Sequence, residues 1–190
     1  MARPRAFDSD AVLDAAQRVF HERGYEATSV QDLVEATGLS RSSLYGAWGD
    51  KHTLFLAVLD RYADAGRRQT AGLCESKSPV EAIRSILDAW SQAGDPRGGL
   101  LFTAAAESAG RDPETAERAD RARKATRDRL ASLVAQAQER GEVGRDRPAS
   151  DVAGLLTGVL YGLRGLKASG ASPEELGVVA ESALAAVTAS

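Results

Sequence analysis

Residues 28–51, TSVQDLVEATGLSRSSLYGAWGDK, decide the fold, because they predict two short helices joined by a tight turn. We expect Thr28 to cap the first helix and Gln31, three residues on, to return the hydrogen bond, as in a capping box. Gly38 favours the left-handed conformation that ends a helix, and Ser40 is placed to cap a second helix two residues later. Helices joined this closely must cross steeply, so the stretch predicts a helix-turn-helix.

The second of these helices has an apolar and a polar side. The apolar contacts of the crossing would come from Leu33, Val34, Leu39, Leu44, Ala47 and Trp48. The opposite side presents Arg41, Ser42, Ser43 and Tyr45. Because the N-terminal residues of a recognition helix reach base edges in the major groove, we expect these four, with Ser40, to contact DNA, and Thr28 and Lys51 to hold flanking phosphates. When only the spacing is considered, the solvated face of an ordinary helical domain explains the pattern equally well.

Residues 7–55 resemble the DNA-binding domain of TetR-type transcriptional regulators. The resemblance rests on VFHERGYEATSV at the end of the first helix, the turn ATGLS, the SLY of the recognition helix and the Asp50-Lys51 pair that opens the next helix. There are departures: Val34 stands where a small Ala is common, AWG replaces the usual aromatic-Phe-Pro sequence, and His52 takes a place often held by an acidic residue. The resemblance implies a three-helix DNA-binding domain, a C-terminal helical domain that binds a small molecule, and a dimer formed by the last two helices.

A second stretch, RGGLLFTAAAESAGRDPE, is similar to a segment found in a subset of these regulators, in which a Gly-Cys-Leu sequence is common. Gly99 replaces that Cys here, so sensing through a thiol at this position is excluded. The single Cys74 is a poor substitute, because nothing in the sequence indicates that its thiol is exposed or activated.

The composition of the 190-residue chain is that of a soluble protein, which we expect in the cytoplasm. No apolar run approaches the roughly 20 residues of a bilayer span, and the first residues lack the apolar core of a signal peptide, so we expect no membrane partner. One Cys cannot form an internal disulfide, and two His give no cluster with metal-ligand spacing. We therefore expect neither a metal nor another cofactor.

The formal net charge of −3 is unusual for a protein that binds DNA, because phosphate contacts come mainly from Lys and Arg. Basic residues nevertheless stand where they are needed, at Arg41, at Lys51 and in the arm formed by residues 1–6. Arg3 and Arg5 of this arm are placed to enter a neighbouring minor groove, although a tail without DNA contacts explains them equally well. The charge predicts strong salt sensitivity and a need for two DNA-binding units acting together.

The remaining pattern is helical throughout, without a strand signal. Asp8 is placed to cap the first helix and Gly24 to end it, while Asp50 would cap a long fourth helix that continues to about Gln69 or beyond. Ser-Pro-x-Glu sequences at 78–81 and 172–175 mark further starts, and the later helices are expected at about 79–92, 99–109, 113–140, 148–168 and 173–188. The predicted fold is all-α with about nine helices, a DNA-binding domain over residues 1–50 and a ligand-binding and dimerisation domain over residues 51–190.

Glycines recur along one side of the expected helix at 148–168. A Gly inside a helix costs roughly 0.8–1 kcal/mol relative to Ala, so the repetition indicates close approach of another helix. That helix is either the last one of the same chain or the equivalent helix of a second subunit. With the implied dimer, the predicted interface consists of Gly154, Gly158, Tyr161, Gly162, Gly165, Ala183 and Val187.

Large side chains in the C-terminal half stand among many Ala and Gly, a mixture that packs poorly. We therefore predict a mostly apolar cavity between the fourth, fifth, sixth and seventh helices, whose ligand is a small apolar or aromatic molecule. Its lining would include Tyr62, Ile86, Trp90, Phe102, Thr126 and Leu130. The alternative is an ordinary core in which these side chains merely fill space.

Together these features predict a homodimeric repressor that leaves a palindromic operator when a small molecule binds. A helical carrier protein that never reads DNA is the second hypothesis, favoured only by the acidic net charge. An enzyme finds little support, because no nucleophile stands at a recognisable spacing from a base, and Glu107 and Asp112 are better explained as a surface carboxylate and an N-cap. The sequence does not decide the effector, the operator, the regulated genes, or whether binding represses or activates.

Overall fold

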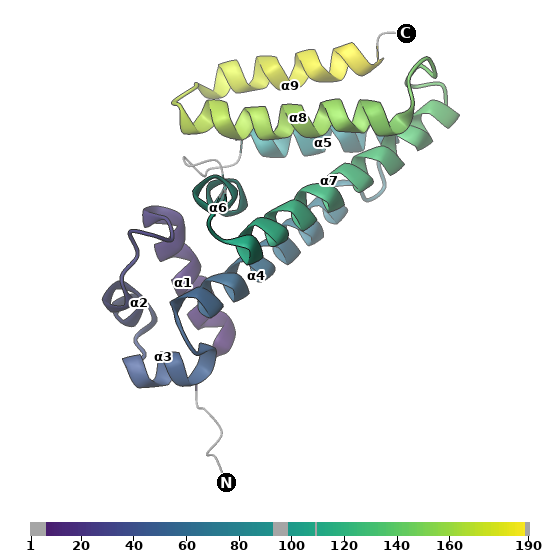
Figure 1. The fold of residues 1–190 in the computed structure, drawn as a ribbon. Coiled ribbons are helices and arrows are strands. Elements are labelled where there is room, and N and C mark those ends of the chain that lie inside the picture. The colour runs from purple at the N-terminus through teal and green to yellow at the C-terminus, as the bar shows by residue number, and fades with distance from the viewer. Residues whose placement is uncertain (1–6, 93–98, 109, 189–190) are drawn as a thin grey trace.

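The computed structural model describes residues 7–92, 99–108 and 110–188 (Figure 1). This part of the chain contains α-helices and no strands, which confirms the all-α prediction. The helices are α1 (Ser9–Arg23), α2 (Val30–Thr37), α3 (Arg41–Trp48), α4 (Lys51–Leu73), α5 (Pro79–Gln92), α6 (Leu100–Ser108), α7 (Pro113–Glu139), α8 (Ala149–Ala168) and α9 (Pro173–Thr188). None of these helices combines the length and the apolar character that a membrane crossing requires. Arg3 and Arg5 lie outside the described residues.

Most of the expected helix ends are confirmed. The Asp8 carboxylate accepts hydrogen bonds from the backbone N–H groups of the first turn of α1, and Gly24 follows its last residue. Gly38 ends α2 in the left-handed conformation, with φ 69°. The two Ser-Pro-x-Glu sequences form reciprocal capping pairs at the starts of α5 and α9.

The predicted cap of α2 is wrong by one residue. Ser29, not Thr28, caps this helix, and it exchanges hydrogen bonds with Asp32 rather than with Gln31. The Thr28 side chain is instead turned inward, where its hydroxyl donates to the Gly24 carbonyl at 2.6 Å. That contact stabilises the turn after α1 and leaves the adjacent Ser29 to cap the helix.

The N-terminal core joins α1, α2 and α3 to the first half of α4. Phe20, Leu33, Leu44 and Phe55 are almost fully buried in it, and the rings of Phe20 and Phe55 meet edge to face at 4.9 Å. Helix α6 also contributes to this core, through Leu100 and Ala104. The DNA-binding helices are therefore packed on two helices that follow them in the sequence.

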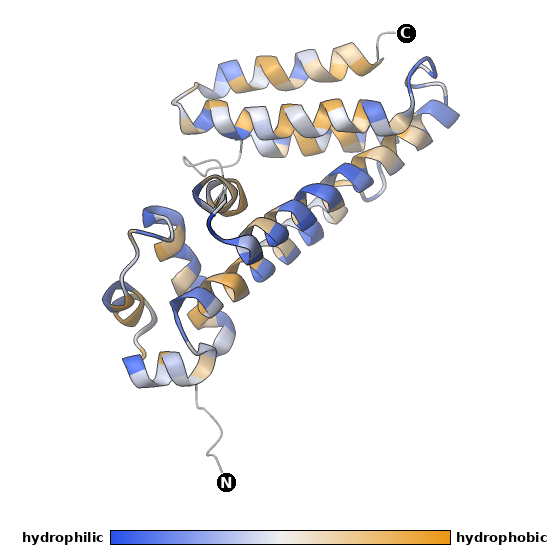
Figure 2. Ribbon diagram, in the orientation of Figure 1, coloured by the Kyte–Doolittle hydropathy of each residue, from blue (hydrophilic) through white to orange (hydrophobic). Residues whose placement is uncertain are grey.

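The C-terminal core is formed by α5, α7, α8 and α9. Its buried residues include Ile83, Leu133, Leu156, Leu160 and Leu184. Helices α8 and α9 lie side by side at the top of Figure 1, and α7 runs from them down along α4 toward the DNA-binding helices. Figure 2 shows that the first half of α7 is hydrophilic, whereas its later part, which enters the C-terminal core, is more apolar.

Candidate DNA-binding surface and effector domain

The first turn of α3 is exposed and held in place from behind. Leu44 is only 1% exposed and fixes the helix in the N-terminal core, whereas Arg41, Ser42 and Ser43 are exposed. Ser40 caps the helix, since its hydroxyl accepts a hydrogen bond from the Ser43 N–H at 3.1 Å. No hydrogen bond or ion pair engages Arg41 in the described part of the chain. Its guanidinium is therefore available to a partner outside the molecule.

The other end of α3 is fixed by aromatic packing. The rings of Trp48 and Phe7 lie 5.8 Å apart, which ties the end of α3 to the residues that precede α1. Tyr45 is partly exposed, one turn after Arg41. This anchoring gives the exposed first turn a fixed direction relative to the rest of the molecule.

The two residues predicted to hold phosphates are engaged within the chain. Thr28 is buried, as described above, and its hydroxyl is used by the Gly24 carbonyl. The Lys51 ammonium donates to the carbonyl oxygens of Tyr25 and Thr28, at 2.9 Å each, and lies 4.3 Å from the centre of the Tyr25 ring. In this structure Lys51 ties the loop between α1 and α2 to the start of α4.

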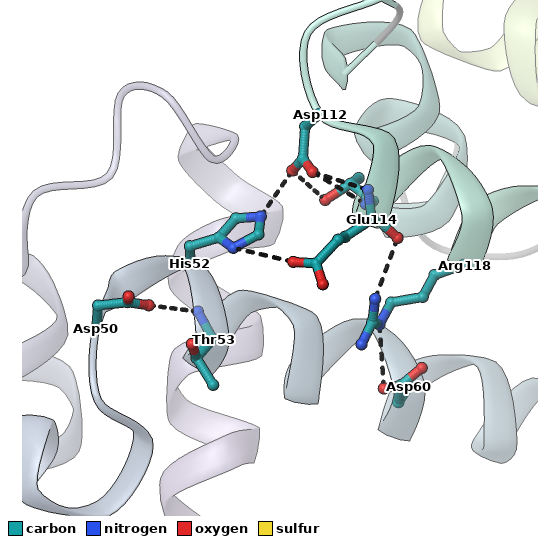
Figure 3. Close-up of polar contacts among 8 residues, drawn as sticks. Asp50, His52, Thr53, Asp60, Asp112, Glu114 and Arg118 are labelled. Carbon is teal, nitrogen blue, oxygen red and sulfur yellow. Dashed lines mark hydrogen bonds and ion pairs between the residues drawn. The ribbon is translucent and has the colours of Figure 1, made fainter.

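A group of polar contacts, which we call the junction, connects the DNA-binding helices with α6 and α7, and Figure 3 shows the part that involves α7. His52 Nε2 lies 2.9 Å from Asp112 Oδ2, and His52 Nδ1 lies 3.7 Å from Glu114 Oε2. A second contact runs from the end of α6, where Glu107 accepts a hydrogen bond from the Tyr25 N–H at 3.1 Å. Both contacts span from the region of α1 and α4 to the helices of the C-terminal half.

Asp112 has two tasks in the junction. Its Oδ1 caps α7 by accepting from the N–H groups of Glu114 and Thr115, which confirms the predicted N-cap, while Oδ2 contacts His52 and the Thr115 hydroxyl. Burial alone would raise the pKa of Asp112, but the hydrogen bonds from Thr115 and His52 outweigh it and lower the pKa to about 2. The carboxylate is therefore charged at any pH at which the protein would function. His52 faces two carboxylates, which explains why an acidic residue would be repelled at its position.

A further ion pair lies along α4. Arg118 of α7 contacts Asp60 of α4 at 3.2 Å and donates to the carbonyl of Glu114 (Figure 3). Beside the junction, a cavity of about 30 Å³ is bordered by Tyr25, Phe55, Glu107 and Asp112. That volume holds about one water molecule and is too small for an effector.

The residues predicted to line an effector cavity are not brought together as one group. Ile86 and Leu130 are each 1% exposed in the C-terminal core, whereas Tyr62 packs against the N-terminal core. The Thr126 hydroxyl donates to the carbonyl one turn earlier in α7. Trp90 of α5 and Phe102 of α6 do belong to one group, because both rings lie near the ring of a third residue, on α8.

That residue is Tyr161, which had been predicted at the dimer interface. Its ring centre lies 6.0 Å from that of Trp90 and 6.2 Å from that of Phe102. Arg164, one turn later on α8, places its guanidinium carbon 4.6 Å from the centre of the Trp90 ring. We call Trp90, Phe102, Tyr161 and Arg164 the aromatic–arginine cluster.

The outer side of α8 and α9, which we call the open face, is apolar and exposed. A Cβ built on Gly154, Gly158 or Gly162 would meet no atom within 4 Å, so α9 does not fill this glycine face within the chain. The large hydrophobic residues exposed in the described part of the chain are Leu155, Leu166 and Val178, and all three belong to these two helices.

Two other predicted interface residues, Gly165 and Val187, are engaged within the chain. A Cβ on Gly165 would contact the Phe102 ring at 3.9 Å, so this glycine serves contact with α6. Val187 is 8% exposed within the C-terminal core, because it lies on the inner side of α9. Ala183, also on α9, is partly exposed.

Two family models cover most of the chain. Residues 12–58 match the model described as bacterial regulatory proteins of the tetR family, and residues 75–176 match the tetracyclin repressor-like C-terminal domain. The chain belongs to the TetR family of transcriptional regulators. The family resemblance seen in the sequence is thereby confirmed, and the protein is a DNA-binding regulator of this family.

Relatives of this TetR-family regulator span nearly its whole length. It is 34% identical to the HTH-type transcriptional repressor ComR of Escherichia coli (strain K12), over 96% of this chain and 90% of ComR. It is 35% identical to the uncharacterized HTH-type transcriptional regulator YezE of Bacillus subtilis (strain 168), over 82% of this chain and 84% of YezE. A solved structure of the regulator CifR, a cysteine mutant complexed with 26-bp operator DNA, is 32% identical and has a TM-score of 0.80, covering 98% of this chain and all of that one.

The sequence of this TetR-family chain did not predict the contacts of the junction and of the aromatic–arginine cluster, because these contacts join residues that are far apart in the chain. His52 was noted only as a departure from the family pattern, and its partner Asp112 lies 60 residues away. Tyr161 and Arg164 stand at the edge of an apolar helix face, where helical periodicity alone does not decide which way a side chain turns. The one available signal was the presence of a cation, Arg164, within the mostly apolar stretch LLTGVLYGLRGL of residues 155–166.

Proposed function

We propose that this TetR-family regulator is a homodimeric repressor that binds a palindromic operator and leaves it when a small molecule with an apolar or aromatic part binds the C-terminal half. The observation that carries this proposal is the exposed first turn of α3, with an unpaired Arg41 beside Ser42 and Ser43. Serine hydroxyls and a guanidinium at the start of a recognition helix suit base edges in the major groove. The similarity to ComR, which is named a repressor, and to CifR, whose structure contains operator DNA, supports the same function.

The open face supports the dimer. Exposed Leu155, Leu166 and Val178 lie around glycines that leave room for a closely packed helix. A two-fold pairing through this face buries the same patch on both subunits and presents two α3 helices to DNA, about 34 Å or a multiple of it apart. The operator is then palindromic, and each half-site contributes to the affinity.

The junction gives the effector a route to α3. A ligand that moves α6 or α7 also moves Glu107 and Asp112, which hold the Tyr25 loop and the start of α4. The ligand needs only to bind the conformation with wrongly spaced recognition helices about 100-fold more tightly than the DNA-binding conformation. This ratio of affinities corresponds to about 2.7 kcal/mol. This is enough to release an operator that is bound with a modest margin.

The experiment uses genomic DNA fragments that the wild-type protein selects, with affinity measured by fluorescence anisotropy. Arg41→Ala should weaken specific binding by about 1–3 kcal/mol, because a base contact is lost. Arg68→Ala is the matched control, since Arg68 is exposed on α4 far from α3 and should leave the affinity unchanged. If Arg41→Ala binds the selected fragments as tightly as the wild type, the assignment of α3 to base recognition is wrong.

The dimer is tested separately by sedimentation. Gly158→Leu adds bulk to the open face at a position where a Cβ meets no atom within 4 Å, so the monomer should keep its helix content. The expected result is monomeric protein with lost operator binding. A dimer that survives this substitution would place the interface elsewhere.

A further inference from the structure

The aromatic–arginine cluster brings together chemistry that the DNA-binding surface and the junction do not use. Its four side chains come from three helices, the consecutive α5 and α6 and the distant α8. All four are partly exposed, so a small molecule can reach them from solvent. The cluster combines two apolar rings, a phenol and a guanidinium, which is a suitable set for a ligand with an apolar body and a polar end.

The guanidinium of Arg164 has a hydrogen-bond donor without an acceptor among the described residues. Its Nη1 atom is buried and has no hydrogen-bond partner among the residues that the structure describes. Trp90 offers the face of its ring to the guanidinium, which partly compensates the positive charge. However, the N–H bonds of a guanidinium lie in its own plane, and the ring provides no lone pair for them. A buried charged donor without an acceptor is unfavourable, so the site is incomplete without a further group.

Tyr161 adds a second donor one helical turn away. No hydrogen bond of its hydroxyl is seen in the described part of the chain, and burial raises the pKa of this phenol, so it stays protonated and can donate. The charged groups that act on this phenol are Arg123 and Asp120 of α7, and the Asp120 carboxylate pairs with both Arg123 and Lys124. No ion pair of Arg164 is found in the described part of the chain, and this guanidinium lies one helical turn after Tyr161 on α8.

We propose that the effector is a small organic acid, whose carboxylate binds the Arg164 guanidinium and the Tyr161 hydroxyl while its apolar or aryl part lies against Trp90 and Phe102. A carboxylate matches the fork of a guanidinium, and a single guanidinium without an ion-pair partner among the described residues suits a single negative charge. Phosphate esters and nucleotides are excluded from this class, because a polyanion would leave charges unpaired at the same site. This inference rests on the proposed function and narrows its effector from apolar molecules to apolar acids.

The test compares acids with uncharged amides of the same shape. Phenylacetate, 3-phenylpropionate and the straight-chain acids of four to ten carbons are each titrated beside the corresponding amide. Two signals are followed: release of selected operator DNA from the full-length protein, and Trp90 fluorescence in a Trp48→Phe background, which leaves a single Trp. At least one acid should release DNA and change Trp90 fluorescence at a concentration tenfold or more below that of its amide.

Variants of the cluster then assign the preference to its residues. Arg164→Gln should abolish the difference between acid and amide, and Arg164→Lys, which keeps the charge without the fork, should retain an intermediate difference. Tyr161→Phe should weaken the acid several-fold. Lys167→Gln is the matched control, because Lys167 is a partly exposed cation one turn further along α8 and should leave the difference unchanged.

Three results would overturn the proposal: equal potency of acid and amide, an Arg164→Gln variant of native helix content that still prefers the acid, or no response to any acid. Operator binding by the wild-type protein is measured in the same experiment. If it is intact while no acid acts, this inference fails and the proposed repressor function stands. If specific DNA binding is itself absent, the proposed function fails first.

Discussion

Replacing Asp112 tests whether the junction stabilises the protein and couples its two halves. Asp112→Asn keeps a side-chain oxygen for the cap of α7 but removes the charge that faces His52. Asp112→Ala removes both the cap and the charge. The difference between these variants separates the two tasks that the structure gives to one carboxylate.

The expected magnitudes follow from the pKa and from the exposure of this carboxylate. A pKa lowered from 3.8 to about 2 corresponds to at most about 2.4 kcal/mol, at 1.36 kcal/mol for each tenfold change in the ionisation constant. The side chain is 23% exposed, and solvent screening reduces the contribution to about 1 kcal/mol. We therefore expect a loss of about 1 kcal/mol for Asp112→Asn and, with about 1 kcal/mol more for the lost cap, about 2 kcal/mol for Asp112→Ala.

The assay is urea unfolding at fixed protein concentration, with a double-mutant cycle that adds His52→Gln. The cycle should give a coupling energy of about 0.5–1 kcal/mol between His52 and Asp112. The functional readout is the effector concentration that releases half of the operator DNA. It should change in Asp112→Asn and stay constant in Arg84→Gln, which breaks an exposed ion pair between α5 and α9 far from the junction.

The reasoning is refuted if Asp112→Ala is no less stable than Asp112→Asn, or if the coupling energy is zero within error. A normal effector response in Asp112→Asn, combined with the expected loss of stability, would show that the junction is structural only. In that case the effector signal reaches α3 by another route, such as the apolar contacts of α6 in the N-terminal core.

Three further outcomes are expected. Because the folded-state pKa of Asp112 is depressed, its contribution should be present above about pH 4 and be lost as the pH falls toward 2, so the stability of Asp112→Asn should depend less on pH in that window. Ser29→Ala should cost about 1 kcal/mol by removing the cap of α2, whereas Gln31→Ala should cost much less, as measured by urea unfolding. Gly24→Ala should destabilise the protein more than Gly38→Ala. Both glycines have positive φ, but only a Cβ on Gly24 would collide with the Glu107 carboxylate, which holds the Tyr25 loop. Equal losses of stability in thermal unfolding would argue against that contact.

The sequence predicted the helices well because their ends carry local signals. Asp8, Ser40, Asp50 and Gly38 act within one turn of their own positions, so reading them requires no knowledge of the fold. The cap of α2 was misassigned because Thr28 and Ser29 are both able to cap. The contact between the Thr28 hydroxyl and the Gly24 carbonyl, which decides between them, appears only once the turn after α1 is formed.

The sites were predicted less completely, for the same physical reason. The exposed side of α3 follows from helical spacing, but whether Lys51 is free depends on two carbonyl groups in a preceding loop. Likewise, the glycines of α8 showed that something approaches this helix, yet only the packed structure separates Gly165, which contacts Phe102, from Gly158, which faces solvent. Local patterns indicate which residues share a face, and tertiary contacts decide what that face meets.

The contribution of α6 to the N-terminal core limits how freely such regulators can be recombined. A hybrid that takes residues 1–58 from one regulator and the remainder from another would place foreign side chains against Leu100 and Ala104, which are buried in the N-terminal core. The unit that can be exchanged is discontinuous in sequence, since it includes α6 as well as α1 to α4. Engineered sensors with a new operator preference should therefore be built by changing the exposed first turn of α3 within this chain, rather than by exchanging the whole N-terminal segment.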